Sequence, residues 1–211
     1  DTDFILSKII PVKKGVGITA QGISAVENIL FSKYLMYKTV YWHKTVRIAT
    51  AMIKKAIITG LLEGFIKSEE LYGLDDNEFF TRYTTDFHPV MKLIKMVHNR
   101  NLYKCVYETP FKPDEGLHNQ LLSLEKRLSF EKDLASEVKC PDLIIDIPEP
   151  ISFEVDLPVS EGPELITYID SDSVFSGPVV DGFSRSLRKI RVYVPEKYSA
   201  AVRNVGDSLF K

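Results

Sequence analysis

The feature that most limits how this chain can fold is a long stretch without proline or glycine, from Ser24 to Thr59. Its apolar positions recur at helical spacing, as in Val26, Leu30, Tyr34, Tyr37 and Tyr41. Ser24 and Glu27 have the spacing of a capping box, in which each side chain satisfies the backbone N–H of the other residue. The stretch therefore predicts one long helix, straight or bent, that ends near Gly60 and Gly64.

Residues 1–22 precede this helix and hold two short apolar runs, Phe4–Leu6 and Ile9–Ile10, followed by turn-prone residues around Gly15 and Gly17. Glycines suit a turn that needs positive φ, so the segment predicts a β-hairpin. The G-x-G spacing lacks the third glycine and the strand-turn-helix context of a phosphate-binding loop, which favours a plain turn.

Shorter elements are predicted in the middle of the chain. Asp75 and Glu78 form a second capping signal. A helix is expected over 86–99 with Pro89 in its first turn, and an extended segment over 102–108. Residues 114–138 predict another helix, with a leucine stripe that packs against the body of the protein: Leu117, Leu121, Leu124 and Leu128.

The character of the sequence changes at Cys140, where prolines separate short apolar runs. Strands are predicted over 143–145, 151–157, 165–169 and 190–194, and a last helix from Pro195 towards Leu209. The predicted fold is α+β and predominantly α-helical. Residues 1–139 would form a helical region with the N-terminal hairpin and long helix, and 140–211 a small β-rich unit closed by a helix.

The charge balance argues against two classes of partner. The chain carries 27 basic and 29 acidic residues, a net charge of −2, so we expect neither nucleic acid nor a membrane surface as partner. Cys105 and Cys140 are far apart and lack zinc-site spacing, which predicts reduced thiols and a cytoplasmic protein.

Two basic clusters are candidate binding sites. Lys33, Tyr37, Tyr41 and Lys44 are spaced three or four residues apart, so a helix would align two cations around two phenols. The stripe could hold a phosphorylated ligand, or its aromatics could pack in the core while the lysines reach water. Arg100 and Lys104 could hold an anion, although the helix macrodipole also explains a basic C-terminus in 98–104.

A complete catalytic site is not visible in these residues. His43, His88 and His118 are not next to an aspartate and have no ligand spacing with another histidine or cysteine. No nucleophile elbow, zinc-protease motif or phosphate-binding P-loop occurs. We therefore predict no metal ligands and no catalytic residues within this chain.

Several segments of the chain, taken in order, match the pattern of a known family. The first lies around Gly22–Glu27 and continues through Tyr34–Tyr37 and Val40–Lys44. The others are Arg100–Lys104, Leu143–Pro148 and Arg191–Glu196. Together they resemble parts of HD-domain dNTP triphosphohydrolases, and the resemblance spans nearly the whole chain.

The resemblance implies a metal-dependent phosphohydrolase acting on nucleotides, with an H…HD…D ligand set N-terminal to the residues seen here. The complete protein would use a divalent metal (Mn, Mg, Fe or Ni), and this chain alone would be inactive. Lys33 falls where relatives place an arginine on the triphosphate, Tyr41 beside the deoxyribose, and Tyr37 where some relatives have a histidine. Lys44, Arg100 and Lys104 fall where nucleotide-activated members bind a regulatory nucleotide between subunits, so a homo-oligomer is expected.

Two alternatives stay open. The chain could be a stand-alone nucleotide- or partner-binding module without catalysis, or a helical oligomerisation domain that uses the leucine stripe. If a catalytic half is missing, the long helix should expose apolar surface.

Overall fold

The computed structural model describes residues 2–13, 15–151 and 157–203, and they fold into two compact units. Unit 1 combines Asp1–Trp42 with Glu149–Arg188, and unit 2 combines His43–Pro148 with Lys189–Lys211. The prediction of an α+β, mainly helical chain is confirmed. The units differ from the predicted regions 1–139 and 140–211, because each unit is built from two separate stretches of chain.

Unit 1 begins with the predicted hairpin, formed by β1 (Ile9–Val12) and β2 (Gly15–Thr19) in antiparallel register. Gly15 has φ +134°, a value that favours glycine. Phe4–Leu6, expected in the hairpin, instead lie in helix α1 (Thr2–Ser7). Two later strands, β5 (Val159–Glu161) and β6 (Glu164–Ile166), complete a sheet of order β1-β2-β5-β6, with β2 and β5 parallel.

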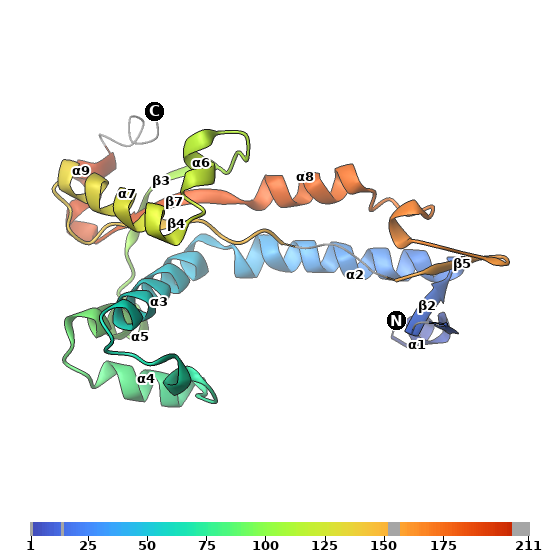
Figure 1. Ribbon diagram of the computed structural model, residues 1–211, viewed down its shortest axis with the longest axis horizontal. Helices are drawn as coiled ribbons and strands as arrows, with labels where there is room; N and C mark the ends of the chain where they lie inside the picture. Colours follow the sequence, from blue (N-terminus) through green and yellow to red (C-terminus); the bar gives the residue numbers. More distant parts are fainter. Residues whose placement is uncertain (1, 14, 152–156, 204–211) are drawn as a thin grey trace. The chain divides into compact units, whose positions relative to one another are not determined.

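The predicted single long helix is wrong, because the chain breaks at the boundary between the units. A short 3-10 turn (Ala20–Gly22) leads into α2 (Ile23–Met36), which continues as a π-helical turn, η2 (Tyr37–Tyr41). Helix α3 (Lys44–Leu62) then starts anew in unit 2 (Figure 1). His43 separates them with ψ 140°, and its Nδ1 accepts a 3.4 Å hydrogen bond from the Thr45 N–H.

The predicted capping box at Ser24 and Glu27 is also wrong. Helix α2 begins after Gly22 without a side-chain cap. The Glu27 Oε1 atom instead accepts hydrogen bonds from the Ser173 hydroxyl at 3.0 Å and the Val174 N–H at 2.8 Å. A carboxylate on α2 therefore holds a loop distant in sequence, which a local capping rule cannot foresee.

Helix α8 (Gly177–Leu187), which the sequence did not predict, packs against α2 in unit 1. The Tyr34 and Phe183 rings stack with centroids 4.3 Å apart. The core of unit 1 is completed by side chains from both sequence stretches: Ile18, Leu30, Trp42, Ile151, Val159, Tyr168, Phe175 and Leu187. The strand predicted over 165–169 is confirmed in its first part by β6, and the 3-10 turn Tyr168–Asp170 takes the place of its end.

Unit 2 holds most of the predicted middle helices, several of them shorter than expected. The Asp75 capping box is confirmed at the start of α4 (Asp76–Thr84). Helix α5 (Lys92–His98) packs on both α3 and α4 (Figure 1). The predicted helices over 86–99 and 114–138 are each split in two: η4 (Pro89–Met91) and α5 (Lys92–His98), then α6 (Gly116–Gln120) and α7 (Leu124–Glu137). A 3-10 turn, η3 (Ser68–Leu71), precedes α4.

The sheet of unit 2 has the order β3-β7-β4, with both pairs antiparallel: β3 (Lys104–Pro110), β7 (Lys189–Val194) and β4 (Ile144–Asp146). The central strand β7 buries alternate residues on opposite faces. Val192 contacts the cluster that includes Leu121 and Leu134, whereas Tyr193 contacts the cluster that includes Met52 of α3. The predicted leucine stripe packs unevenly, since Leu121 is buried and Leu124 is exposed.

A buried ion pair attaches α3 to the sheet. The Arg47 Nε atom donates to Asp146 Oδ2 at 2.9 Å, and the second guanidinium nitrogen contacts Asp146 Oδ1. The Tyr193 hydroxyl donates to the same carboxylate at 3.3 Å. Burial raises the pKa of Tyr193, and so does the neighbouring Asp146 carboxylate, which keeps the phenol protonated as a donor.

The end of the chain agrees with the prediction as far as it is described. After β7, a 3-10 turn (Glu196–Tyr198) leads into α9 (Ser199–Arg203). Residues 204–211 of the predicted last helix, and 152–156 of the predicted strand 151–157, lie outside the described residues. Across residues 2–13, 15–151 and 157–203, no helix has the length and apolar content that a membrane span requires.

Candidate functional site

The π-helical turn η2 brings together two tyrosines of the predicted ligand stripe. The Trp42 N–H donates to the Tyr37 carbonyl at 2.8 Å, the five-residue step of a π-turn. The Tyr37 and Tyr41 rings lie 5.2 Å apart at 52°, and Tyr37 also meets Trp42 edge-on at 5.9 Å. Single π-turns inside helices are frequent at functional sites, so this turn marks the stripe as a candidate site.

The side chains in this segment differ in burial, so packing in the core describes some of them and ligand binding describes others. Trp42 is buried and Tyr37 is half-buried in its cluster, which is the packing role. Tyr41 keeps 52% of its surface exposed, so its phenol is accessible to a ligand.

Lys33 lies one helical turn before Tyr37. The Tyr37 N–H donates to the Lys33 carbonyl, so the two side chains share a face of the helix. Lys33 is half-buried, which suits a long side chain that packs its stem along the helix and presents its ammonium group at the edge. The predicted residues Lys33, Tyr37 and Tyr41 thus follow one face of α2 and η2 in unit 1.

Lys38, in the same π-turn, has different surroundings. Its ammonium nitrogen lies 5.7 Å from the centre of the Tyr34 ring, a cation–π contact. Thr39, its neighbour, donates its hydroxyl to the Leu35 carbonyl at 2.7 Å. Lys38 therefore carries the same charge in the same segment as Lys33 but lies against Tyr34, outside the predicted stripe, which makes it a matched control.

The second predicted group, Lys44, Arg100 and Lys104, belongs to unit 2 and is spread over three elements. Lys44 opens α3, and Lys104 opens β3, where its ammonium lies 3.5 Å from Glu196. Arg100 follows α5 in a left-handed conformation with φ 57°, a place that glycine usually occupies after a helix. All three residues are exposed.

Lys44 has an electrostatic effect on Cys105. Burial raises the pKa of the Cys105 thiol, and the Lys44 ammonium partly offsets that rise. Burial also raises the pKa of Cys140. Both cysteines are free and buried, so they are protonated, unreactive thiols at neutral pH.

Metal binding is not supported by the described residues, among which no three His, Cys, Asp or Glu side chains group together as ligands. Each candidate histidine has a local contact instead. His43 caps α3, His118 Nδ1 accepts from the Lys112 N–H at 3.0 Å, and the His88 ring stacks on Phe65 at 4.1 Å.

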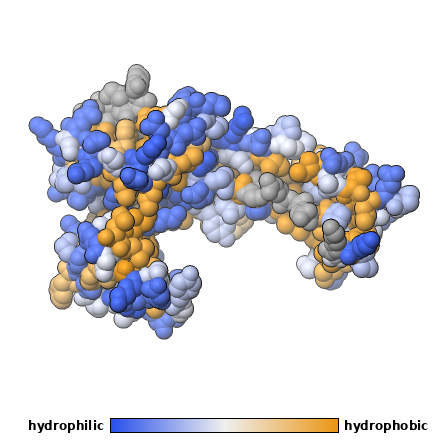
Figure 2. Space-filling model, in the orientation of Figure 1, coloured by the Kyte–Doolittle hydropathy of each residue, from blue (hydrophilic) through white to orange (hydrophobic). Residues whose placement is uncertain are grey.

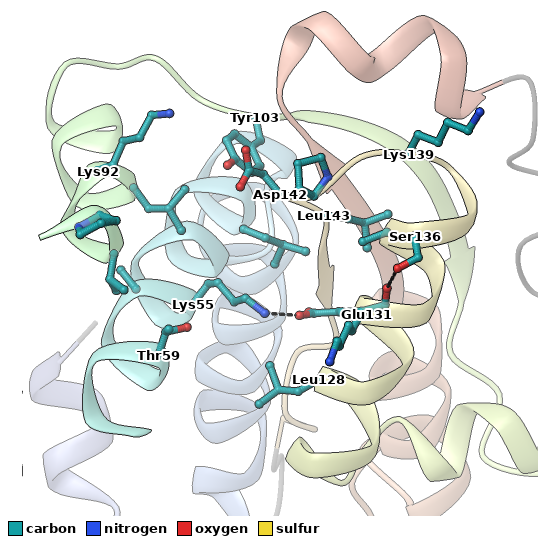
Figure 3. Close-up of a pocket in the computed structure, with 18 residues that line it drawn as sticks. Lys55, Thr59, Lys92, Tyr103, Leu128, Glu131, Ser136, Lys139, Asp142 and Leu143 are labelled. Carbon is teal, nitrogen blue, oxygen red and sulfur yellow. Dashed lines mark hydrogen bonds and ion pairs between the residues drawn. The ribbon is translucent and has the colours of Figure 1, made fainter. Parts of the chain in front are cut away.

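A pocket of about 710 Å³ in unit 2 was missed by the sequence reasoning. It lies between α3, α5 and α7, and its lining includes Lys55, Lys92, Lys132 and Lys139 (Figure 3). These lysines come from three separate regions of the sequence, since only Lys132 and Lys139 are near one another, and they share no motif. Only the packing of three helices brings them together, so no local sequence signal could have found the site.

The fold and these residues define a helix-dominated α+β region with basic and aromatic surface positions and no metal-ligand group in its described part. Residues 1–211 match the protein family described as HD associated region. The chain therefore belongs to the HD associated region family.

Three similar proteins extend this finding. An uncharacterized protein of Methanocaldococcus jannaschii is 30% identical over 220 residues, covering 94% of this chain and 44% of the relative. A hypothetical protein from Aquifex aeolicus has TM-score 0.64 and 20% identity, covering 97% of this chain and 50% of that chain. A phosphohydrolase from Bacteroides thetaiotaomicron has TM-score 0.56 and 16% identity, covering 93% of this chain and 56% of that chain. This chain thus spans about half the length of these proteins.

Proposed function

We propose that this chain is part of a metal-dependent HD-superfamily nucleotide phosphohydrolase acting on dNTP-like substrates, and that it forms one wall of the nucleotide pocket. Membership of the HD associated region family supports the proposal, as does a structural neighbour described as a phosphohydrolase. The lengths of the relatives leave room for a catalytic half outside these 211 residues.

The observation that carries the proposal is the π-turn that pairs Tyr37 with Tyr41 one turn beyond Lys33. In this role the Lys33 ammonium binds a phosphate and the exposed Tyr41 phenol contacts the sugar. Tyr37 packs behind Tyr41 and limits the positions of its ring. A lysine holds phosphate as a point charge, without the two parallel hydrogen bonds that an arginine provides.

The divalent metal of this proposal, Mn, Mg, Fe or Ni, would be held by residues outside this chain. No ligand group for it occurs in the part of the chain that the structure describes. When bound, such a metal lowers the pKa of a water molecule and makes it a nucleophile. The residues of this chain bind and orient the nucleotide.

The test is Lys33→Ala in the full-length protein, with dNTP hydrolysis as the assay and Lys38→Ala as the control. A hydrogen bond to a charged group contributes about 1.5–3 kcal/mol, so we expect kcat/KM to fall roughly 10- to 100-fold. Lys38→Ala should change it less than about twofold, because that lysine contacts the Tyr34 ring. Equal effects of the two changes would refute the assignment of Lys33.

The alternative is a stand-alone binding module, and the same protein distinguishes it. Nucleotide binding that depends on Lys33 and Tyr41, without hydrolysis when each candidate metal is added, would favour the module. Hydrolysis that requires a metal and both side chains would favour the phosphohydrolase.

We further propose that Lys44, Arg100 and Lys104 bind a regulatory nucleotide between subunits of a homo-oligomer. Their exposure and positive charge support this role. Sedimentation of the full-length protein with and without added nucleotide tests it. Nucleotide should promote assembly of the wild type, and Arg100→Glu should abolish that response. An oligomeric state that is the same with and without nucleotide would contradict the proposal.

A further inference from the structure

The pocket of unit 2 has the size, walls and charges of a small-molecule site. Its volume of about 710 Å³ lies within the range of roughly 300–1,000 Å³ that is usual for ligand pockets. None of its lining residues is among those assigned above.

The walls of the pocket are mainly apolar. The apolar residues that line it include Ala56 of α3, Leu93 of α5, Leu128 and Ala135 of α7, and Leu143 and Ile144. Figure 2 shows an apolar stretch of surface on unit 2 where α3 is seen. Such walls favour an organic ligand with an apolar body over a free inorganic ion.

The charged residues around these walls are mostly cationic. Lys55, Lys92, Lys132 and Lys139 line the pocket together with two carboxylates, Glu131 and Asp142. The Glu131 carboxylate is already engaged, because it contacts the Lys55 ammonium and accepts from the Ile145 N–H at 2.8 Å. Figure 3 shows the Lys55–Glu131 pair across the pocket from α3 to α7. Once the Lys55–Glu131 pair is set aside, the other charged side chains of the lining have a positive net charge, which favours an anionic ligand.

Tyr103 adds a buried hydrogen-bond donor. Its side chain is 4% exposed and lies beside Asp142 in the pocket (Figure 3). Burial raises the pKa of the Tyr103 phenol, and the Asp142 carboxylate raises it further, so the hydroxyl stays protonated.

Lys139, at the other side of the pocket, belongs to the end of α7. It has φ 51°, the left-handed conformation that follows α7, where the Cys140 N–H donates to the Ala135 carbonyl at 2.9 Å. Glycine usually occupies this position, because other residues lose free energy in that conformation. The helix macrodipole gives a cation there some compensation, so the end of the helix accounts for this lysine.

We propose that this pocket binds a small organic anion, with its apolar body between α3, α5 and α7 and its phosphate or carboxylate head at Lys92 (Figure 3). Lys55 is held towards α7 by Glu131 and keeps 27% of its side chain exposed, so it can also contact the ligand. The site does not depend on the function proposed for Lys33, Tyr37 and Tyr41.

The test uses the full-length protein and the fluorescent probe 8-anilinonaphthalene-1-sulfonate, which joins an apolar ring system to an anionic group. Lys92→Glu should weaken probe binding about tenfold, as expected for reversal of a contacting charge. Lys95→Glu is the matched control, because Lys95 is exposed on the same helix outside the pocket, and it should change the affinity less than about twofold.

Two further variants locate the probe. Ser136→Trp places an indole at an exposed position of the lining and should remove the binding that Lys92→Glu weakens. Lys139→Gly should raise the melting temperature by about 2–4 °C, because glycine relieves the left-handed backbone, and should change probe binding less than about twofold, because the Lys139 side chain points away from the pocket (Figure 3). A loss of binding as large as that of Lys92→Glu would overturn the placement of the anionic head at Lys92.

Competition identifies the head group. Displacement of the probe by phenyl phosphate alone would assign a phosphate, and equal displacement by phenylacetate would assign a general anion. Displacement by benzyl alcohol to the same extent would overturn the proposal. Equal effects of Lys92→Glu and Lys95→Glu, or failure of the full-length protein to bind the probe in the pocket, would also overturn it.

Discussion

Unit 1 and unit 2 fix their main helices by different interactions. In unit 2, α3 combines apolar packing with two ion pairs to distant residues, Arg47 to Asp146 and Lys55 to Glu131. In unit 1, α2 is held by apolar and aromatic packing against α8 and by the Glu27 carboxylate. Both kinds of contact bring together residues that are far apart in the sequence.

The two helices also differ in what they leave exposed. Helix α2 is buried on the side of Val26 and Leu30, yet Ile29, Phe31 and Leu35 are 50%, 48% and 41% exposed. Figure 2 shows such apolar atoms on the surface of unit 1. A helix that is apolar on nearly all sides is typical of one covered by further protein. We propose that the exposed side of α2 in unit 1 is an association surface.

The largest expected effect concerns the buried ion pair of unit 2. Arg47→Met leaves the Asp146 carboxylate buried without its main partner, which should lower the free energy of unfolding of unit 2 by about 3–5 kcal/mol. Thermal or urea unfolding of the full-length protein measures it. Arg82→Met is the control, since the Arg82–Glu70 pair is largely exposed and should contribute ~1 kcal/mol or less. A small loss for Arg47→Met would remove the contrast between the units.

The second effect concerns the packed side of α2. Leu30 is buried, so Leu30→Ala should destabilise unit 1 by about 2–5 kcal/mol through lost packing and a cavity. Hydrogen exchange would locate the loss, because amides of α2 and α8 should exchange faster while those of β7 keep their protection. A loss spread evenly over both units would show that they unfold as one.

A smaller effect depends on pH and concerns Glu108 in unit 2. Burial alone would raise the pKa of Glu108, but hydrogen bonds from Lys189 and Arg191 lower it below the usual 4.5. The folded state therefore gains stability above pH 4.5 that is lost as the pH falls through the lowered pKa. Glu108→Gln should flatten the stability curve below that pH, with a change of about 1 kcal/mol or less. An unchanged curve would mean that another carboxylate determines the pH dependence of stability in this range.

The smallest effect on stability should come from the exposed side of α2. Replacing Ile29 or Leu35 by serine should change the free energy of unfolding by roughly 0.5 kcal/mol or less, because both are exposed. Self-association, followed by light scattering against concentration, should fall in the same variants. Unchanged scattering would contradict the view that this side associates.

Local signals in the sequence predicted some elements well. The hairpin glycine, the Asp75 capping box and the apolar strand β7 each depend on neighbouring residues alone, and each was found as predicted. Helix α8 was missed because Gly177, Pro178 and Gly182 weaken its helical pattern, and its stability comes from packing on α2. The break between the helices at His43 was missed because no proline or glycine lies near it in the sequence.

The candidate sites also divide into features that neighbouring residues predict and features that depend on contacts between distant residues. The stripe of Lys33, Tyr37 and Tyr41 was predicted from helical spacing, whereas the π-turn that pairs the tyrosines was not, because it depends on a shifted backbone hydrogen bond. The lysine pocket and the Arg47–Asp146 pair join residues separated by long stretches of chain, so they become visible only in three dimensions.

The hydrogen bond from the Ile145 N–H to Glu131 has a consequence for solubility. Strand β4 is one of the two outer strands of its sheet, and an outer strand with unpaired N–H groups can recruit a strand from another molecule. The Glu131 carboxylate accepts the hydrogen bond of one such N–H group, that of Ile145. A strand from another molecule would have to displace this negatively charged side chain before it could pair there. One side chain thus helps to prevent growth of the sheet from molecule to molecule.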